Sequence, residues 1–171
     1  VMFNAPRYLA VIAAGNDRDG GVNPTKNGYD LLTKYCTAKN AVVVAAVDQV
    51  LSYTGPNSVV MSSFSNWGPT DDNRIKPDIS TKGVAVYSTS DNPSKKGYAN
   101  SQGTSMAAPG ITGSLLLLQQ HFYNLYGDFM YSSTLRGLMS HTASEAGSYP
   151  GPDAMFGWGL MNTGEAAQII T

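Results

Sequence analysis

The stretch GTSMAAPGITGSLLLLQQHF, residues 103–122, does most to decide the fold. Small residues open it and an apolar run at 115–118 follows, which predicts a largely buried helix. We expect Pro109 in the first turn of this helix, where its missing N–H has no partner to lose. Ser105 then lies at a helix N-terminus, where unpaired N–H groups and the helix dipole stabilise negative charge. Taken alone, however, Ser105 is better explained as a plain helix N-cap.

Two continuous apolar runs upstream predict buried strands. Residues 8–14 lead to a break at Gly15-Asn16, and residues 41–47 (AVVVAAV) form the second run. Strands that are apolar throughout are typical of a parallel sheet whose faces are both covered by helices.

The remaining segments complete an α/β pattern. We predict shorter strands over 58–64 and 84–87, an exposed loop or hairpin over 91–102, and short helices over 133–142 and 163–170. Because the sequence has no internal repeat or linker, the economical interpretation is one α/β layer domain over residues 1–171.

The composition excludes several classes of protein. Charged residues make up 13% and apolar residues 42%, which argues against a charge-rich disordered segment. The net charge is -1 and the basic residues are scattered, so no nucleic-acid-binding stripe is present. No apolar run approaches the roughly 20 residues of a membrane span. The single cysteine, Cys36, cannot form an intrachain disulfide, and we expect a buried, unreactive thiol.

The octet from Gly103 to Gly110 closely resembles the nucleophile motif of the subtilisin-like serine proteases (subtilases, peptidase family S8). The resemblance implies that Ser105 is the nucleophile of a serine endopeptidase. It also implies a three-layer αβα fold with a mostly parallel central sheet. On this interpretation residues 1–171 are the C-terminal portion of the catalytic domain.

The segment Ala13-Ala14-Gly15-Asn16 is similar to the family segment that supplies the oxyanion-hole asparagine. The resemblance implies that the Asn16 side-chain amide and the backbone N–H of Ser105 donate to the developing oxyanion. Alone, Asn16 would be explained as a turn residue after glycine.

Further matches follow in the family's order. They are 63–69 (SFSNWGP), 74–79 (RIKPDI), 138–143 (LMSHTA) and 157–162 (GWGLMN), so that the resemblance spans about residues 8–168. By resemblance Asp78 is structural and is not part of the catalytic triad. Where the family often has Ala-Pro-Gly, this chain has Thr81-Lys82-Gly83, so that the glycine is retained and the proline is not.

The catalytic Asp and His motifs of the family occur nowhere in these residues. His121 lies in the predicted helix of Ser105, about 24 Å along its axis, whereas proton transfer requires roughly 3 Å. We expect His141 to be a helix-end or packing histidine. Without a base Ser105 is a poor nucleophile. We therefore expect the isolated chain to be inactive and expect its partner to be an N-terminal part of the same protease, or another chain, that supplies Asp and His.

The resemblance also implies a polypeptide substrate that pairs with strand edges beside the cleft. Ala13, Ala14 and Gly15 would form one wall of the primary specificity pocket, and Thr104 is assigned to substrate binding with them. No cofactor is expected. Relatives often bind calcium, but the loop 17–21 lacks the distal glutamate of a calcium loop and is better explained as a solvated turn. A secreted or extracytoplasmic location is expected from the family alone.

Two alternatives remain open. One is a pseudoprotease that has lost Asp or His and serves in binding or scaffolding. The other is an unrelated α/β hydrolase, whose Gly-x-Ser-x-Gly motif is not matched because Ala107 stands where its second glycine would be.

Overall fold

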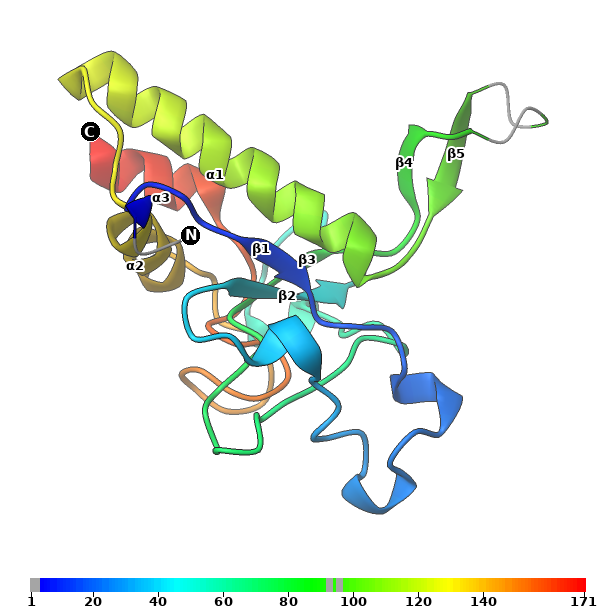
Figure 1. Ribbon diagram of the computed structural model, residues 1–171. Coiled ribbons are helices and arrows are strands. Elements are labelled where there is room, and N and C mark those ends of the chain that lie inside the picture. Colours follow the sequence, from blue (N-terminus) through cyan, green and yellow to red (C-terminus); the bar gives the residue numbers. More distant parts are fainter. Residues whose placement is uncertain (1–3, 92–93, 95–96) are drawn as a thin grey trace.

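The computed structural model describes residues 4–91, 94 and 97–171, and it builds a mixed α/β fold on a three-stranded parallel sheet (Figure 1). Strands, 3-10 helices (η) and α-helices occur in this order: β1 (Val11–Ala13), η2 (Arg18–Gly20), η3 (Pro24–Lys26), η4 (Lys34–Thr37), β2 (Val42–Val47), η5 (Pro56–Ser58), β3 (Ile79–Lys82), β4 (Val86–Thr89), β5 (Tyr98–Ser101), α1 (Thr104–Tyr126), α2 (Ser132–His141) and α3 (Thr163–Ile170).

Strand β2 is the centre of the sheet, and all of its residues are buried. It pairs in parallel with β1, with Val11 opposite Val42, and in parallel with β3, with Val44 opposite Ile79. The continuous apolar run therefore marks a strand buried on both faces, as predicted. The expected α/β fold with a parallel sheet is confirmed.

The two faces of β2 contact different layers. One face packs Val42 and Val44 against α1, α2 and α3, which Figure 1 shows together on one side of the sheet. The other face packs Val43 against Cys36 in η4. In the residues that the structure describes, turns and loops rather than α-helices cover this second face. Cys36 is buried, as predicted, and burial is the main cause that raises the pKa of its thiol.

Helix α1 is buried along one face only. Ala107, Ile111 and Leu118 pack into the core, whereas Leu116 is 64% exposed. The expectation of a largely buried helix is therefore wrong for the outer face. The expected place of Pro109 is also wrong, because α1 begins at Thr104 and the proline lies beyond its first turn.

Two strand predictions need correction. Residues 58–64 form no strand and contribute only one isolated bridge, between Met61 and Val47. The third parallel strand is β3, which precedes the predicted 84–87 strand. Strand β4 instead pairs with β5 in an antiparallel hairpin that projects from the body of the molecule (Figure 1). The hairpin predicted over 91–102 thus begins earlier. Helices α2 and α3 lie where they were predicted.

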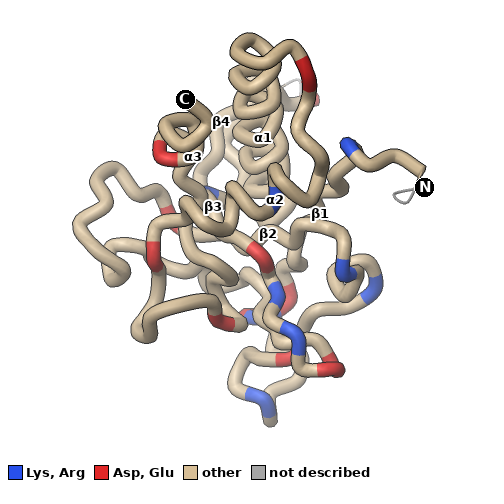
Figure 2. Tube along the Cα trace, turned by 90° about the vertical axis from the view of Figure 1, so that its left-hand side faces the viewer, with Lys and Arg blue, Asp and Glu red and all other residues tan. Residues whose placement is uncertain are grey.

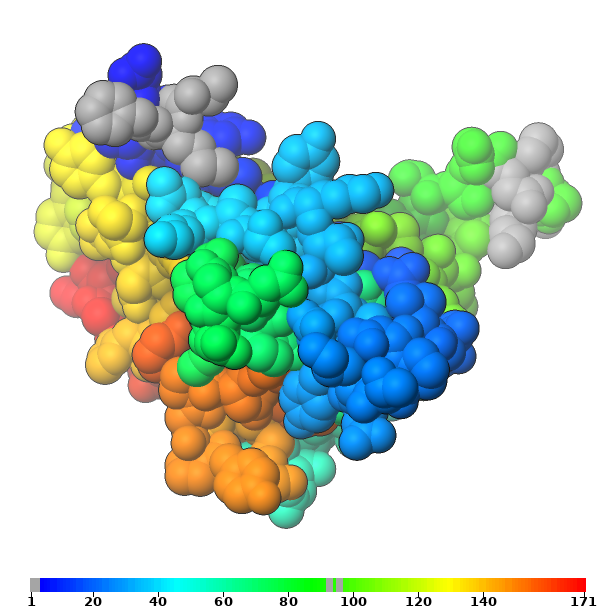
Figure 3. Space-filling model, turned by 60° about the horizontal axis from the view of Figure 1, so that its bottom comes forward, coloured from blue at the N-terminus to red at the C-terminus, as the bar shows by residue number. Residues whose placement is uncertain are grey.

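Charged residues gather away from α1. That helix contains no Lys, Arg, Asp or Glu, and Figure 2 shows the charges mainly in the loops around the sheet. The loops that follow β1, precede β3 and precede α3 form the face seen in Figure 3. None of the helices described here is both long and apolar enough to cross a lipid bilayer.

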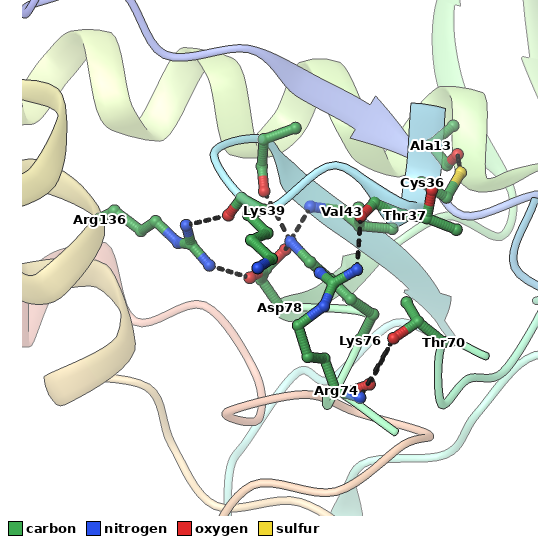
Figure 4. A network of polar contacts seen from close by, with 11 residues as sticks. Ala13, Cys36, Thr37, Lys39, Val43, Thr70, Arg74, Lys76, Asp78 and Arg136 are labelled. Atoms are coloured by element: carbon green, nitrogen blue, oxygen red, sulfur yellow. Dashed lines mark hydrogen bonds and ion pairs between the residues drawn. The ribbon is translucent and has the colours of Figure 1, made fainter. Parts of the chain in front are cut away.

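A buried ionic network ties α2 to the sheet (Figure 4). Asp78, only 4% exposed, binds the Lys76 ammonium with one carboxylate oxygen and Arg136 Nη2 with the other, at 2.7 Å for Arg136. The backbone N–H of Val43 also donates to Asp78, at 2.7 Å. Burial lowers the pKa of Lys76, and the neighbouring Asp78 carboxylate opposes that shift. This arrangement agrees with a structural role for Asp78.

Candidate active site

The candidate site lies where the parallel strands end. The Gly15-Asn16 turn follows β1, and Gly83 follows β3. The N–H of Gly103 donates to the carbonyl of Gly83 at 2.8 Å, and α1 starts at the next residue. The helix N-terminus and the Asn16 turn therefore meet at the carboxyl edge of the sheet, where open α/β sheets bind their ligands.

Asn16 is held directly by Thr104. The Asn16 amide oxygen accepts from the Thr104 N–H at 2.8 Å and from the Thr104 hydroxyl at 2.9 Å. The hydroxyl in turn accepts from the N–H of Gly15 at 3.1 Å. Because a backbone N–H can only donate, these contacts assign the oxygen of the amide to Thr104. They leave the Asn16 Nδ2 group free to donate elsewhere.

Ser105 is exposed and lies in the first turn of α1. Its backbone N–H has no hydrogen-bond partner in the described part of the chain, as is usual for the second residue of a helix. Gly103, at φ 147°, lies beside both candidate donors: a Cβ at this position would be 3.4 Å from Asn16 Nδ2 and 3.7 Å from Ser105 N. Glycine thus keeps the space between the two donors open.

The predicted substrate-binding residues surround this turn. Ala13 ends β1, Ala14 is buried, and Gly15 adopts φ 108°. Thr104 is fully buried, and its side chain orients Asn16 instead of facing solvent. The Cys36 thiol lies 3.2 Å from the carbonyl of Ala13 and so supports the proposed wall from behind.

The orienting role of Thr104 and the spacing role of Gly103 were not predicted from the sequence. The signal that could have suggested both roles is a glycine followed by threonine and serine at a helix start. A threonine hydroxyl can accept one hydrogen bond and donate another, and glycine permits close approach.

Neither histidine lies near Ser105. His121 is on the same unbroken helix, α1, about 24 Å along the axis, and its Nε2 lies 3.3 Å from the hydroxyl of Thr171. His141 is the exposed last residue of α2, as expected for a helix-end histidine. The described residues therefore offer Ser105 no imidazole base.

The acidic residues of the loop after β1 have protein partners. Asp17 accepts from Asn66 Nδ2 at 2.8 Å, and Asp19 accepts from the hydroxyl of Ser63 at 3.1 Å. Within the described ranges, no three His, Cys, Asp or Glu residues are grouped so that they could hold a metal ion.

Comparison with known proteins places the chain in a family. The model of the subtilase family matches residues 3–159. The chain is 42% identical over 78 residues to a PII-type proteinase of Lactococcus lactis subsp. cremoris, which is 45% of this chain and 4% of that protein. It is 41% identical over 75 residues to a C5a peptidase of Streptococcus pyogenes, which is 44% of this chain and 6% of that protein. The chain thus spans a small part of the curated relatives it matches.

Solved structures share the fold. A lanthipeptide protease superposes with a TM-score of 0.69 at 19% identity, covering 94% of this chain and 50% of that one. The patellamide maturation protease PatA superposes with a TM-score of 0.68 at 24% identity, covering 95% of this chain and 51% of that one. At identities below 25%, this similarity shows a shared fold.

Proposed function

Because the chain belongs to the subtilase family, we propose that it carries the nucleophile and the oxyanion hole of a serine endopeptidase. Ser105 is the nucleophile, and Asn16 Nδ2 and the Ser105 N–H are the oxyanion donors. The Asp and His of the triad come from outside these residues, from an N-terminal part of the same protease or from another chain. We call this chain, together with whichever of these supplies the Asp and His, the complete protease.

The observation that carries the proposal is the contact between Asn16 and Thr104. Residues far apart in the sequence meet so that two unpaired donors, Asn16 Nδ2 and the Ser105 N–H, both lie beside Gly103. Fixed donors of this kind stabilise the charge that develops on a carbonyl oxygen during acyl transfer. A plain helix N-cap at Ser105 is not supported, because Gly103 is the N-cap residue and Ser105 lies inside the helix.

The proposed reaction needs no cofactor. Ser105 Oγ attacks the scissile carbonyl carbon while the supplied histidine takes its proton. The C–N bond then breaks, and the leaving amine takes that proton. Water hydrolyses the acyl-Ser105 ester and regenerates the hydroxyl. Asn16 and the Ser105 N–H bind the oxyanion in both halves of the reaction.

The proposed substrate is an extended polypeptide. The Ala13–Gly15 segment forms one wall for the side chain before the scissile bond. Met106, which follows Ser105 in the chain, lines a groove between the β4–β5 hairpin and the start of α1, together with Val86, Ser101 and Pro109. We place the protein outside the cytoplasm on the strength of its family.

The surface for the partner is the free edge of β1 and the groove beside it. Strand β1 pairs with β2 on one side and has no strand partner on the other among the described residues. An apolar groove there is lined by residues such as Tyr8, Leu9, Val11 and Leu116. An unpaired parallel edge next to exposed leucine favours a further strand and its covering layer.

We expect Leu116→Asp to lower the stability of the complete protease, whereas this chain alone should remain folded with the same substitution. The side chain is exposed here, but an apolar partner in the groove would have to bury the new carboxylate, at a cost of about 2 kcal/mol or more. Leu51→Asp is the control, since Leu51 is 88% exposed and does not line the groove. Denaturant unfolding of both variants, in the chain and in the complete protease, is the measurement. Equal effects of the two substitutions in the complete protease would contradict the docking surface.

Labelling with a fluorophosphonate serine probe tests the proposed function. We expect the probe to modify Ser105 in the complete protease and to modify the isolated chain negligibly, because the chain lacks a base. Ser105→Ala is the control for site identity, and mass spectrometry of the labelled peptide is the readout.

Two results would separate the alternatives. Strong labelling of the isolated chain would overturn the claim that a base must be supplied. No labelling of a well-folded complete protease would favour a pseudoprotease used for binding or scaffolding.

A further inference from the structure

Asn66 is a buried residue that contacts the neighbours of Asn16 on both sides. It lies in the loop between η5 and β3 and is 2% exposed. Its backbone N–H donates to the carbonyl of Gly15 at 3.0 Å. Its side-chain oxygen accepts from the backbone N–H of Asp17 at 2.7 Å. Asn66 thus brackets Asn16 without touching the space beside Ser105.

The side-chain amide of Asn66 uses its donors as well. Its Nδ2 donates to the Asp17 carboxylate at 2.8 Å and to the Leu31 carbonyl at 3.2 Å. Since the Asp17 N–H can only donate and the Leu31 carbonyl can only accept, the amide has one orientation that satisfies every partner. A buried amide with all its partners in place is a rigid support.

Gly15 fits this support closely. A Cβ at Gly15 would lie 2.3 Å from Asn66 Nδ2, and the backbone there has φ 108°. Only glycine allows the Asn66 amide to lie this near the turn. The loop that carries Asn66 is itself anchored to the sheet, because the N–H of Ala46 in β2 donates to the Ser65 hydroxyl at 3.0 Å.

Two residues therefore hold the turn from different parts of the chain. Thr104 binds the Gly15 N–H and the Asn16 side-chain oxygen. Asn66 binds the Gly15 carbonyl and both the N–H and the carboxylate of Asp17. Asn16 itself is exposed; Thr104 contacts its side chain directly, whereas Asn66 contacts its two neighbours in the chain.

We infer that Asn66 is a positioning residue for the oxyanion donor: it fixes the backbone of residues 15–17 so that Asn16 Nδ2 stays beside the Ser105 N–H. This inference rests on the proposed protease function for its catalytic consequence. Its structural consequence, a fixed backbone at residues 15–17, can be tested without measuring catalytic activity.

The first experiment uses the chain alone. Asn66→Ala is expected to speed hydrogen exchange at the Asp17 amide roughly tenfold and to shift the NMR signals of the Asn16 side-chain amide. Asn162→Ala is the matched control, because Asn162 caps α3 through Glu165 and also donates to Ser144, away from the turn. A folded Asn66→Ala variant with unchanged Asn16 and Asp17 signals would overturn the inference.

The second experiment uses the complete protease. Asn66→Ala is expected to lower kcat roughly tenfold with little change in KM, because a displaced oxyanion donor acts in the transition state. Asn162→Ala is expected to leave both constants nearly unchanged. A rise in KM at constant kcat would overturn the positioning role. Absence of activity in the unsubstituted complete protease would refute the proposed function, and the exchange experiment would still decide the role of Asn66 in the turn.

A second variant guards against a failure to fold. Asp17 is exposed, so Asp17→Ala removes one partner of Asn66 without burying a new group. We expect the Asn16 signals to shift in the same direction as in Asn66→Ala, by a smaller amount. Asp19→Ala is the control, because Asp19 is also exposed but binds Ser63 instead. Equal spectra for these two variants would count against the inference.

Discussion

Asn16→Ala is expected to lower kcat of the complete protease by about 10² to 10³, with KM nearly unchanged. The substitution removes Nδ2, one of the two donors beside Gly103, while the Ser105 N–H remains. This magnitude is the one known for the oxyanion-hole asparagine of a subtilisin. Steady-state kinetics on a peptide substrate is the measurement.

The control for Asn16→Ala is Asn57→Ala. Asn57 is an exposed asparagine in η5 that takes no part in the hydrogen bonds joining Asn16 to Thr104, and its loss should leave kcat unchanged. Thr104→Val is the companion variant. It removes the hydroxyl that binds the Asn16 oxygen but keeps the Asn16 donor, so it should cost less than Asn16→Ala. A kcat of Asn16→Ala within about twofold of the unsubstituted enzyme would remove Asn16 from the oxyanion hole.

The sequence predicted those elements whose signals are local. Strand β2 is an unbroken apolar run, and α3 has helical spacing over the residues where the structure places it. Strand β3 was missed because its sequence, ISTK, is not an apolar run. The buried Ser80 is instead satisfied by its hydroxyl, which donates to the Gly159 carbonyl at 2.8 Å. A polar residue paired by a distant loop leaves no periodic pattern in the sequence.

The outer face of α1 illustrates a second limit. Four consecutive leucines indicate burial, yet Leu116 and Leu117 are 64% and 63% exposed in this chain. A hydrophobic pattern predicts that a surface is apolar and does not specify which partner covers it. Under the proposed function, the strand and layer that cover this face belong to the complete protease.

The prediction of the candidate site depended on the family resemblance more than on the hydrophobic pattern of the sequence. Nothing in the spacing of Asn16 and Thr104 predicts that they touch, and a serine at a helix start is common. The octet and the Ala-Ala-Gly-Asn segment were informative because they occur together and in the family's order. The contact between Asn66 and the Asn16 turn had no such marker: Asn66 lies within the 63–69 match, but nothing in that match indicated a contact with residues 15–17.

Asp78→Ala is expected to destabilise the chain by about 3–5 kcal/mol. The substitution leaves the buried Lys76 ammonium without its charge partner and the Val43 N–H without its acceptor. It also removes the ion pair of Arg136 with Asp78 and leaves Arg136 with its hydrogen bond to the Lys39 carbonyl. Urea unfolding followed by circular dichroism is the measurement. Asp128→Ala, which breaks an exposed pair with Arg7, is the control and should cost no more than about 1 kcal/mol.

The pH dependence of the free energy of unfolding tests whether the unpaired lysine causes this loss of stability. Burial already lowers the pKa of Lys76 and Asp78 opposes that shift, so in Asp78→Ala the pKa should fall further. At pH values between this lowered pKa of Lys76 in the folded chain and the ordinary lysine pKa of 10.5, the unfolded chain binds more protons than the folded chain. The stability of Asp78→Ala should therefore rise with pH relative to the unsubstituted chain. Adding Lys76→Met should recover part of the loss near neutral pH and flatten this dependence, because it removes the buried charge. If Lys76→Met instead adds a further loss to Asp78→Ala at every pH, the unpaired ammonium is not the source of the instability.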